Sequence, residues 1–83
     1  MSPKASSGRT SLDLYIMNKV RELRISKGYS QAVLAVMMDV SDAFIGQVEN
    51  VKGNKKYNLS HLNKLAQIFK CSPRDFLPEQ PIE

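Results

Sequence analysis

Apolar residues recur at helical spacing along this chain, and this pattern is the strongest constraint on its fold. Residues 12–27, 31–38, 42–50 and 59–69 each place apolar side chains three or four positions apart, so that each segment has one apolar stripe. No segment shows the sustained alternation of apolar and polar residues that marks a half-buried strand. The pattern predicts an all-α domain in which short helices pack their stripes into one core.

Helix-start signals stand before several of these segments. Ser30, Ser41 and Asn58 directly precede a segment, where a side-chain oxygen can accept a hydrogen bond from a backbone N–H of the first turn. The run Ser-Pro-Arg-Asp at 72–75 adds a fifth short helix, because Ser caps, Pro fits the first helical position and Asp completes a capping box. Pro78 cannot continue that helix, so we expect it to end just before this residue.

The chain has 83 residues, which suits one small domain. We expect a flexible basic arm over 1–10, the folded domain over 11–77 and a tail over 78–83. No apolar run approaches the roughly 20 residues of a membrane helix, and the start lacks the apolar stretch of a secretory signal. The single cysteine, Cys71, and single histidine, His61, exclude a disulfide framework and a zinc cluster. These features predict a cytoplasmic protein.

Charge is unevenly distributed along the chain, which carries +4 overall. Residues 1–27 hold six basic and two acidic side chains, and residues 51–74 hold six basic and no acidic ones. Residues 28–50, in contrast, hold three acidic side chains and no Lys or Arg. Basic flanks around an acidic centre suit a polyanion such as nucleic acid, and ordinary solubilising charge is the alternative interpretation.

A turn of three residues separates the segments 31–38 and 42–50. Two short helices at this spacing form a helix-turn-helix, in which the second helix lies in the DNA major groove. If Ile45 and Val48 point inward, one outward face of the second helix is left for base readout. The predicted base contacts on this face are Asp42, Ala43, Gly46 and Gln47.

Several short motifs follow one another between residues 20 and 77. They are Leu23-Arg24, Gly28-Tyr29-Ser30-Gln31, Leu34-Ala35, Val40-Ser41, Ile45, Gln47-Val48-Glu49-Asn50, Leu59, Leu65-Ala66, Phe69 and Ser72. In this order they resemble the Cro/repressor-like (XRE) helix-turn-helix family. The resemblance implies a compact five-helix, lambda-repressor-like fold that is usually dimeric and binds operator DNA. The chain departs from the family pattern at Asp39 and Val51, where the family usually has glycine.

Each candidate base contact has its own chemistry. Gln47 can pair with adenine, and Ala43 can pack on a thymine methyl group. Asp42 either accepts from a cytosine amino group or only stabilises the start of its helix through the helix dipole. Gly46 either lets the backbone approach DNA closely or is a weakness of about 1 kcal/mol that packing offsets.

The resemblance also implies contacts to the sugar-phosphate backbone. The residues concerned are Ser30, Gln31, Ser41, Asn50, Lys52, Lys55 and Lys56, followed by Tyr57 in the same loop. In similar proteins the residue matching Gln31 touches a phosphate and braces the recognition helix, while the residue matching Glu49 ties that helix to its neighbours, here through Arg24. A solvated charge run is the alternative for the lysines.

These observations together predict a small transcriptional regulator, with repression as the expected mode, that binds duplex DNA sequence-specifically. We expect a homodimer on a palindromic operator, with Leu77 and Ile82 as candidate dimer contacts. No cofactor, metal or enzymatic activity is predicted, because no catalytic arrangement or glycine-rich phosphate loop is evident. The alternative is a protein-binding helix-turn-helix module, such as an antitoxin or anti-repressor, in which the acidic residues 28–50 meet a protein partner.

Overall fold

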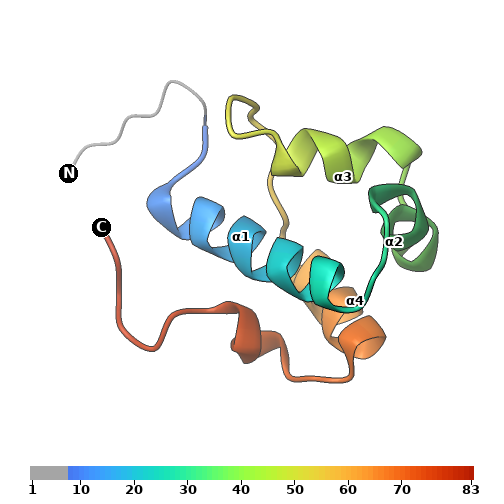
Figure 1. Cartoon of the computed structure of the whole chain (residues 1–83). Coiled ribbons are helices and arrows are strands. Elements are labelled where there is room, and N and C mark those ends of the chain that lie inside the picture. Colours follow the sequence, from blue (N-terminus) through green and yellow to red (C-terminus); the bar gives the residue numbers. More distant parts are fainter. Residues whose placement is uncertain (1–7) are drawn as a thin grey trace.

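A computed structural model describes residues 8–83 of the chain. These residues form four α-helices and one short 3-10 helix. The helices are α1 (Ser11–Ser26), α2 (Gln31–Met38), α3 (Asp42–Glu49) and α4 (Leu59–Phe69), and the 3-10 helix is η1 (Pro73–Phe76). No strand occurs among these residues, so the all-α class is confirmed. Helices α2 and α3 lie together at one end of the molecule, and η1 lies beside α1 and α4 (Figure 1). Most of the predicted arm, residues 1–7, falls outside the described residues.

The fifth predicted helix is a 3-10 helix, so the described residues form four α-helices and a fifth α-helix is not confirmed. Its backbone bonds join residues three apart, from Asp75 N to Ser72 O at 2.9 Å and from Leu77 N to Arg74 O at 3.0 Å. Pro73 begins this element and Pro78 follows it closely, which leaves space for one turn only. A single turn closes readily with the tighter three-residue bonds.

Side-chain caps begin most of the helices, as the sequence predicts. At α1, Thr10 Oγ1 accepts from Asp13 N at 3.1 Å, and Asp13 Oδ2 accepts from Thr10 N at 2.9 Å. At α4, Asn58 and His61 form the same reciprocal box, with distances of 2.8 and 3.0 Å. The observed bounds shift by one residue from prediction at both ends of α1 and at the end of α3, since Asn50 is already extended.

Ser41 precedes α3 without a side-chain cap hydrogen bond, which contradicts its predicted capping role. The Phe44 N–H donates instead to the Ser41 backbone oxygen at 3.1 Å. A tight first turn therefore satisfies the amide that the serine hydroxyl would otherwise have taken.

Two left-handed residues set the turns around α2. Gly28, after α1, has a φ of 75°, and Asp39, at the end of α2, has a φ of 60°. Asp39 takes the place of the usual glycine, and aspartate tolerates this conformation better than most residues. The Asp39 N–H donates to Val36 O at 3.1 Å, so the turn between α2 and α3 forms without glycine.

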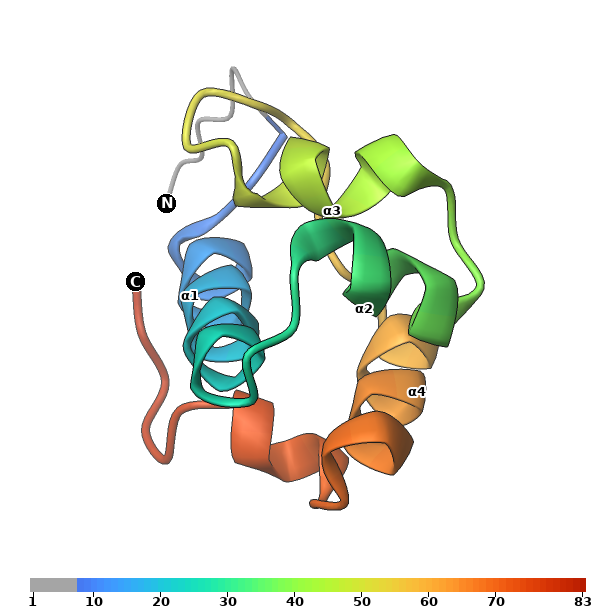
Figure 2. The ribbon, with the colours of Figure 1, turned by 45° about the vertical axis from the view of Figure 1, so that its right-hand side comes forward.

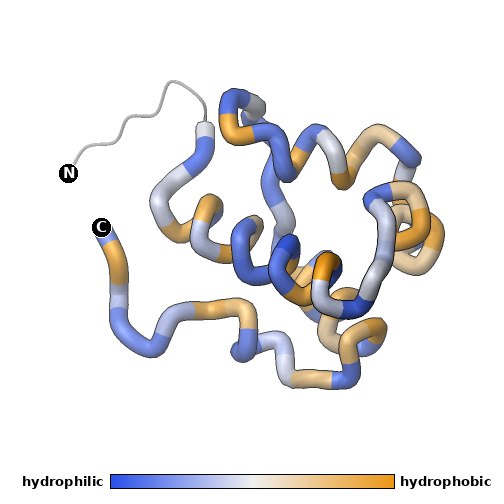
Figure 3. Tube along the Cα trace, in the orientation of Figure 1, coloured by the Kyte–Doolittle hydropathy of each residue, from blue (hydrophilic) through white to orange (hydrophobic). Residues whose placement is uncertain are grey.

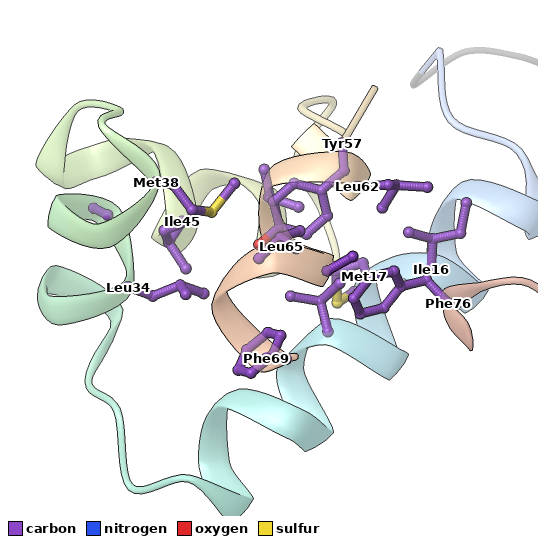
Figure 4. Packing of buried hydrophobic residues seen from close by; sticks show 14 residues of the cluster. Ile16, Met17, Leu34, Met38, Ile45, Tyr57, Leu62, Leu65, Phe69 and Phe76 are labelled. Atoms are coloured by element: carbon purple, nitrogen blue, oxygen red, sulfur yellow. The ribbon is translucent and has the colours of Figure 1, made fainter. Parts of the chain in front are cut away.

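All five helices contribute to a single core (Figure 4). Its buried apolar side chains are Ile16, Met17, Val20, Leu34, Ala35, Met38, Ile45, Val48, Tyr57, Leu62, Leu65, Ala66, Phe69 and Phe76. These residues include Ile45 and Val48, the predicted inward positions of the third helix. In the tube coloured by hydropathy, hydrophobic and hydrophilic residues alternate along α1, α3 and α4, whereas α2 is mostly hydrophobic (Figure 3). The predicted stripes thus face the interior.

Tyr57 belongs to this core, whereas the sequence places it among the basic loop residues. Only 6% of it is exposed, and its ring meets Phe44 and His61 with centroids 6.0 and 5.9 Å away. Burial raises the pKa of Tyr57, since it penalises the charged phenolate. Tyr57 therefore fastens the loop to the core and is not available to a phosphate.

None of the described helices is by itself long and apolar enough to cross a bilayer. Helices α2 and α3 reach that length and apolarity only as a pair, and the pair is bent by 117°. An angle near this value is typical of the two helices of a helix-turn-helix.

Candidate nucleic-acid interface

Helix α3 presents one face to solvent and the other to the core. Ile45 and Val48 are fully buried on the inner face. Asp42, Ala43 and Gln47, three of the four predicted base contacts, are exposed on the outer face. Figure 2 shows α3 at the periphery of the molecule, above α2 and away from α4. Three of the four positions of the predicted face are therefore exposed to solvent.

Gly46, the fourth predicted base contact, is half-buried beneath a side chain of α2. A Cβ atom at this position would lie 3.2 Å from Gln31 Oε1. The missing side chain therefore makes room for the Gln31 amide. This close packing supports the packing interpretation of Gly46, and its approach to DNA stays a prediction.

Glu49 anchors the inner side of α3 through several polar bonds. Arg24 Nε donates to Glu49 Oε2 at 2.9 Å, and Arg24 Nη2 donates to Oε1 at 2.8 Å. Gln31 Nε2 also donates to Glu49 Oε1, at 3.0 Å. The predicted tie between Glu49 and Arg24 is confirmed, as is the bracing of α3 by Gln31.

This ion pair is largely shielded from water. The Glu49 and Arg24 side chains are only 4% and 11% exposed, respectively. The hydrogen bonds to Glu49 raise the pKa of Arg24, against the opposing effect of burial. Arg24 Nη1 also donates to the Tyr29 carbonyl at 2.9 Å, just before α2. One guanidinium thus links α1, the start of α2 and the end of α3.

A tight turn follows α3 and carries the predicted lysines. Asn50 Oδ1 accepts from Lys52 N at 3.0 Å, and the Asn50 carbonyl accepts from Gly53 N at 2.9 Å. A Cβ on Gly53 would lie 3.0 Å from the Gln47 backbone oxygen. The close approach that requires glycine is therefore at Gly53, whereas Val51, where the family has glycine, is 75% exposed.

The three predicted lysines of the loop have different surroundings. Lys52 and Lys55 are exposed next to the C-terminal end of α3. Lys56 Nζ lies 3.4 Å from the Gly8 carbonyl and 3.6 Å from Asp13 Oδ2. Lys56 is therefore drawn toward the start of α1, and its charge is partly compensated there.

The serines predicted to touch the DNA backbone lie at helix starts. Ser30 is exposed and its hydroxyl accepts from Val33 N at 3.0 Å, which caps α2. Ser41 is exposed at the start of α3. Helix starts carry unpaired N–H groups and a partial positive charge, which suit a phosphate.

Arg9 is the residue near this surface that sequence reasoning missed. Its Nη1 donates to the carbonyls of Val48 at 2.9 Å and Lys55 at 3.1 Å, and its Nη2 donates to the Asn50 carbonyl at 2.7 Å. The sequence only places Arg9 within the arm. Bonds between residues 39 to 46 positions apart leave no periodic pattern in the sequence. The one local signal is that the last turn of α3 has no basic residue of its own, so that its carbonyls need a donor from elsewhere.

Among residues 8–83, no group of three or more His, Cys, Asp or Glu side chains could hold a metal ion. His61 instead serves the cap of α4, where its Nδ1 accepts from Asn58 N.

Comparisons with known proteins agree with this geometry. The model of the helix-turn-helix family HTH_3 matches residues 20–76. The chain is 32% identical to the restriction-modification controller protein C.AhdI from Aeromonas hydrophila, over 76% of this chain and 92% of that one, with a TM-score of 0.65. It is 31% identical to an HTH_3 family transcriptional regulator from Vibrio cholerae, over 78% of this chain and 35% of that one, also with a TM-score of 0.65.

A shorter match involves the HTH-type transcriptional regulator RamB of Mycobacterium tuberculosis. The two share 42% identity over 36 residues, which is 43% of this chain and 8% of RamB. This chain therefore spans only a small part of the RamB length. Since the family model covers well over half of the chain, and the relatives are regulators with the same fold, the chain belongs to the XRE-type helix-turn-helix family HTH_3 of DNA-binding transcription regulators.

Proposed function

We propose that this chain binds duplex DNA sequence-specifically as a small transcriptional regulator, with α3 in the major groove. One observation carries the proposal: Asp42, Ala43 and Gln47 are exposed together on a helix that the core and Glu49 hold in place. Base readout needs a protruding helix whose side chains reach base edges from a fixed position. Helix α3 meets both conditions.

Gln47 is the residue that we assign to direct base readout. It is exposed on the outer face of α3, and its amide offers a donor and an acceptor, which match the major-groove edge of adenine. Ala43, one turn earlier, is placed to pack on a thymine methyl group. Asp42 lies in the first turn of α3, where it accepts from a cytosine amino group or stabilises the helix dipole alone.

Phosphate contacts are assigned to the groups that surround this face. Ser30 and Gln31 begin α2, Ser41 begins α3, and Asn50, Lys52 and Lys55 follow it. Helix starts and ammonium groups both attract phosphate oxygens. Among the lysines, we assign the phosphate contacts first to Lys52 and Lys55, because the charge of Lys56 is already close to Asp13.

A dimer completes the proposal. One recognition helix reads only a few base pairs, and two-fold pairing on a palindromic operator doubles the site. Leu77 and Ile82 remain 38% and 42% exposed, as a homodimer contact near the chain end requires. We propose repression, by occlusion of a promoter, as the regulatory mode. The relatives are named regulators and a controller protein, which supports control of transcription as the role.

A second candidate function is a protein-binding module. Val33 and Val36 lie three residues apart on α2 and are 46% and 73% exposed. Apolar side chains that face water together are a feature of protein contact surfaces. In this case α2 would meet a protein partner, and the exposed face of α3 would not read bases.

Fluorescence anisotropy with labelled duplexes tests the proposal. The chain should bind random-sequence DNA with a strong salt dependence, and a site selected from a random library should bind more tightly. Gln47→Ala should cost about 1–3 kcal/mol on the selected site and relax its preference at one base pair. Lys64→Ala, an exposed change on α4, serves as the control for general loss of charge.

The lysines are tested in the same experiment. Lys52→Ala and Lys55→Ala should each weaken binding to all sequences and lower the salt slope by about 0.9. Absence of binding to any duplex at low salt would contradict the proposal. If binding is absent while Val33→Ser and Val36→Ser abolish association with a protein partner, the second candidate replaces it.

A further inference from the structure

We propose that Arg9 is a positioning residue for DNA binding, which fixes the end of the recognition helix and the lysine loop from a position 39 to 46 residues earlier in the sequence. The lysine loop is defined here as residues 50–56. The proposal rests on the proposed function, because it explains how the loop is held where phosphate contacts need it. Arg9 itself acts through the loop and not by touching DNA.

The end of α3 lacks the usual means of capping a helix. Asn50 is extended with a φ of −76°, no left-handed glycine follows, and the last turn holds no basic side chain. The last carbonyls of a helix have no partner within the helix and carry a partial negative charge. A cation or donor from elsewhere is therefore stabilising at this position.

Arg9 supplies that donor. One guanidinium bonds the Val48 carbonyl in the last turn of α3 and the Asn50 carbonyl at its cap, at 2.9 and 2.7 Å. The same group bonds the Lys55 carbonyl at 3.1 Å. Asn50 and Lys55 lie near the two ends of the lysine loop, so Arg9 holds the loop ends together. The planar guanidinium serves several carbonyls at fixed angles, as a lysine ammonium on a flexible stem does not.

A second contact between the same two segments supports this assignment. Lys56 Nζ reaches the Gly8 carbonyl at 3.4 Å, so the bonds between residues 8–9 and the loop run in both directions. Figures 1 and 2 both show the segment before α1 passing beside the loop that follows α3. The turn inside the loop, from Asn50 to Gly53, begins at the carbonyl that Arg9 binds. Loss of Arg9 should therefore loosen this turn before it affects the core.

Amide hydrogen exchange of the DNA-free chain tests the hold on the loop. The reporter amides are Lys52, bonded to the Asn50 side chain, and Gly53, bonded to the Asn50 carbonyl. Arg9→Ala should speed their exchange on the order of tenfold, through easier local opening, while the core amide of Leu65 keeps its rate. Arg9→Lys retains the positive charge but lacks the planar guanidinium that donates to several carbonyls at once. It should therefore speed the exchange of the Lys52 and Gly53 amides to the same degree. Unchanged rates at Lys52 and Gly53 in both variants would overturn the proposal.

A double-mutant experiment on DNA separates positioning from direct phosphate contact. In the wild-type background, Arg9→Ala should lower the salt slope by more than the roughly 0.9 of one phosphate contact, because two lysines lose their position. In a Lys52→Ala, Lys55→Ala background, the same change should leave the slope unaltered. A further fall of about 0.9 in that background would show that Arg9 binds a phosphate itself, and would overturn the proposal.

The two tests also separate this inference from the proposed function. If the wild-type chain binds no duplex, the proposed function fails, and exchange rates in the free chain still decide whether Arg9 holds the loop. If wild-type binding is strong and Arg9→Ala binds with wild-type affinity and slope, the inference fails and the proposed function stands. Lys64→Ala provides the matched loss of one positive charge at an exposed site away from the loop.

Discussion

Two glycines close to the recognition helix show how the absence of a side chain shapes the proposed DNA-binding surface. At Gly46, a Cβ would approach the end of the Gln31 side chain at 3.2 Å. At Gly53, a Cβ would approach the Gln47 backbone oxygen at 3.0 Å. A side-chain amide can rotate away, whereas a helical carbonyl cannot. The two positions therefore differ in how strictly they require glycine.

Alanine substitution should separate the two glycines. Gly46→Ala should change the free energy of unfolding by less than about 1 kcal/mol, because the helix propensity gained offsets the displacement of Gln31. Gly53→Ala should cost about 1–3 kcal/mol, as overpacking against a fixed backbone does. Urea denaturation followed by circular dichroism measures both values. Equal losses in the two variants would show that the loop adapts as easily as the Gln31 side chain.

At the scale of elements, α3 is held by one buried carboxylate. Glu49 receives bonds from Arg24 on α1 and Gln31 on α2, so a single side chain relates three helices. Removal of one partner from a buried ion pair leaves the other charge without compensation. Because Glu49 is two residues, about half a turn, from Gln47 and lies on the inner side of the helix, the same bonds set the direction of the outer face.

Glu49→Ala should therefore destabilise the domain by about 3–5 kcal/mol, a large share of the stability of a small domain. Replacement of both partners, by Arg24→Met with Glu49→Leu, should recover part of the loss, since no buried charge remains. Glu22→Ala on the exposed surface of α1 is the matched control and should cost less than about 0.5 kcal/mol. Chemical unfolding of the wild type and these three variants measures the losses. A loss below about 1 kcal/mol for Glu49→Ala would mean that apolar contacts alone hold α3.

The start of α4 should make stability depend on pH through His61. Asn58 N donates to His61 Nδ1, so this nitrogen must be unprotonated, and burial lowers the pKa of His61 from its usual value near 6.5. The rings of Phe44 and Tyr57 face the imidazole from α3 and the loop. As the pH falls below about 6.5, the unfolded chain takes up the proton first. The stability that the neutral His61 cap contributes is therefore fully present above that pH, and it is lost as the pH falls through the pKa of His61 in the folded chain.

The pH effect can be isolated because the chain has one histidine. His61→Gln keeps an acceptor for the capping box but does not titrate. The free energy of unfolding of the wild type should fall between pH 7.5 and 5, more steeply than that of His61→Gln. Parallel curves for the two proteins would contradict the role of His61 in the cap.

At the scale of the whole molecule, local signals predicted most of the fold. Caps such as Ser30 and Asn58, together with apolar spacing of three and four, placed all four α-helices within a residue of their bounds. Asp39, which stands where the family usually has glycine, forms the left-handed turn after α2. These features depend on neighbours in the sequence, so the sequence can reveal them.

The features that sequence reasoning missed depend on contacts between distant residues. Tyr57 is buried by edge-on packing of its ring against Phe44 and His61, whereas its place in a basic run predicted an exposed loop residue. The role of Arg9 arises from carbonyls that lie 39 to 46 residues further along. Backbone carbonyls have no sequence signature, so such a contact is visible only in the folded chain. The roles of Asp42, Ala43, Gly46 and Gln47 toward bases stay predictions.

Amide chemical-shift mapping with a selected duplex tests the central claim, that α3 and the lysine loop form the DNA-binding surface. As the duplex is added, the largest shifts should occur at residues 42–47 and 50–56, with smaller ones at the start of α2. The amide chemical shifts near Val36 should not change. Those of η1 (Pro73–Phe76), where residues other than proline are observed, should also stay constant unless a dimer contact forms there. Shifts centred on the exposed valines of α2, with α3 unaffected, would contradict the account.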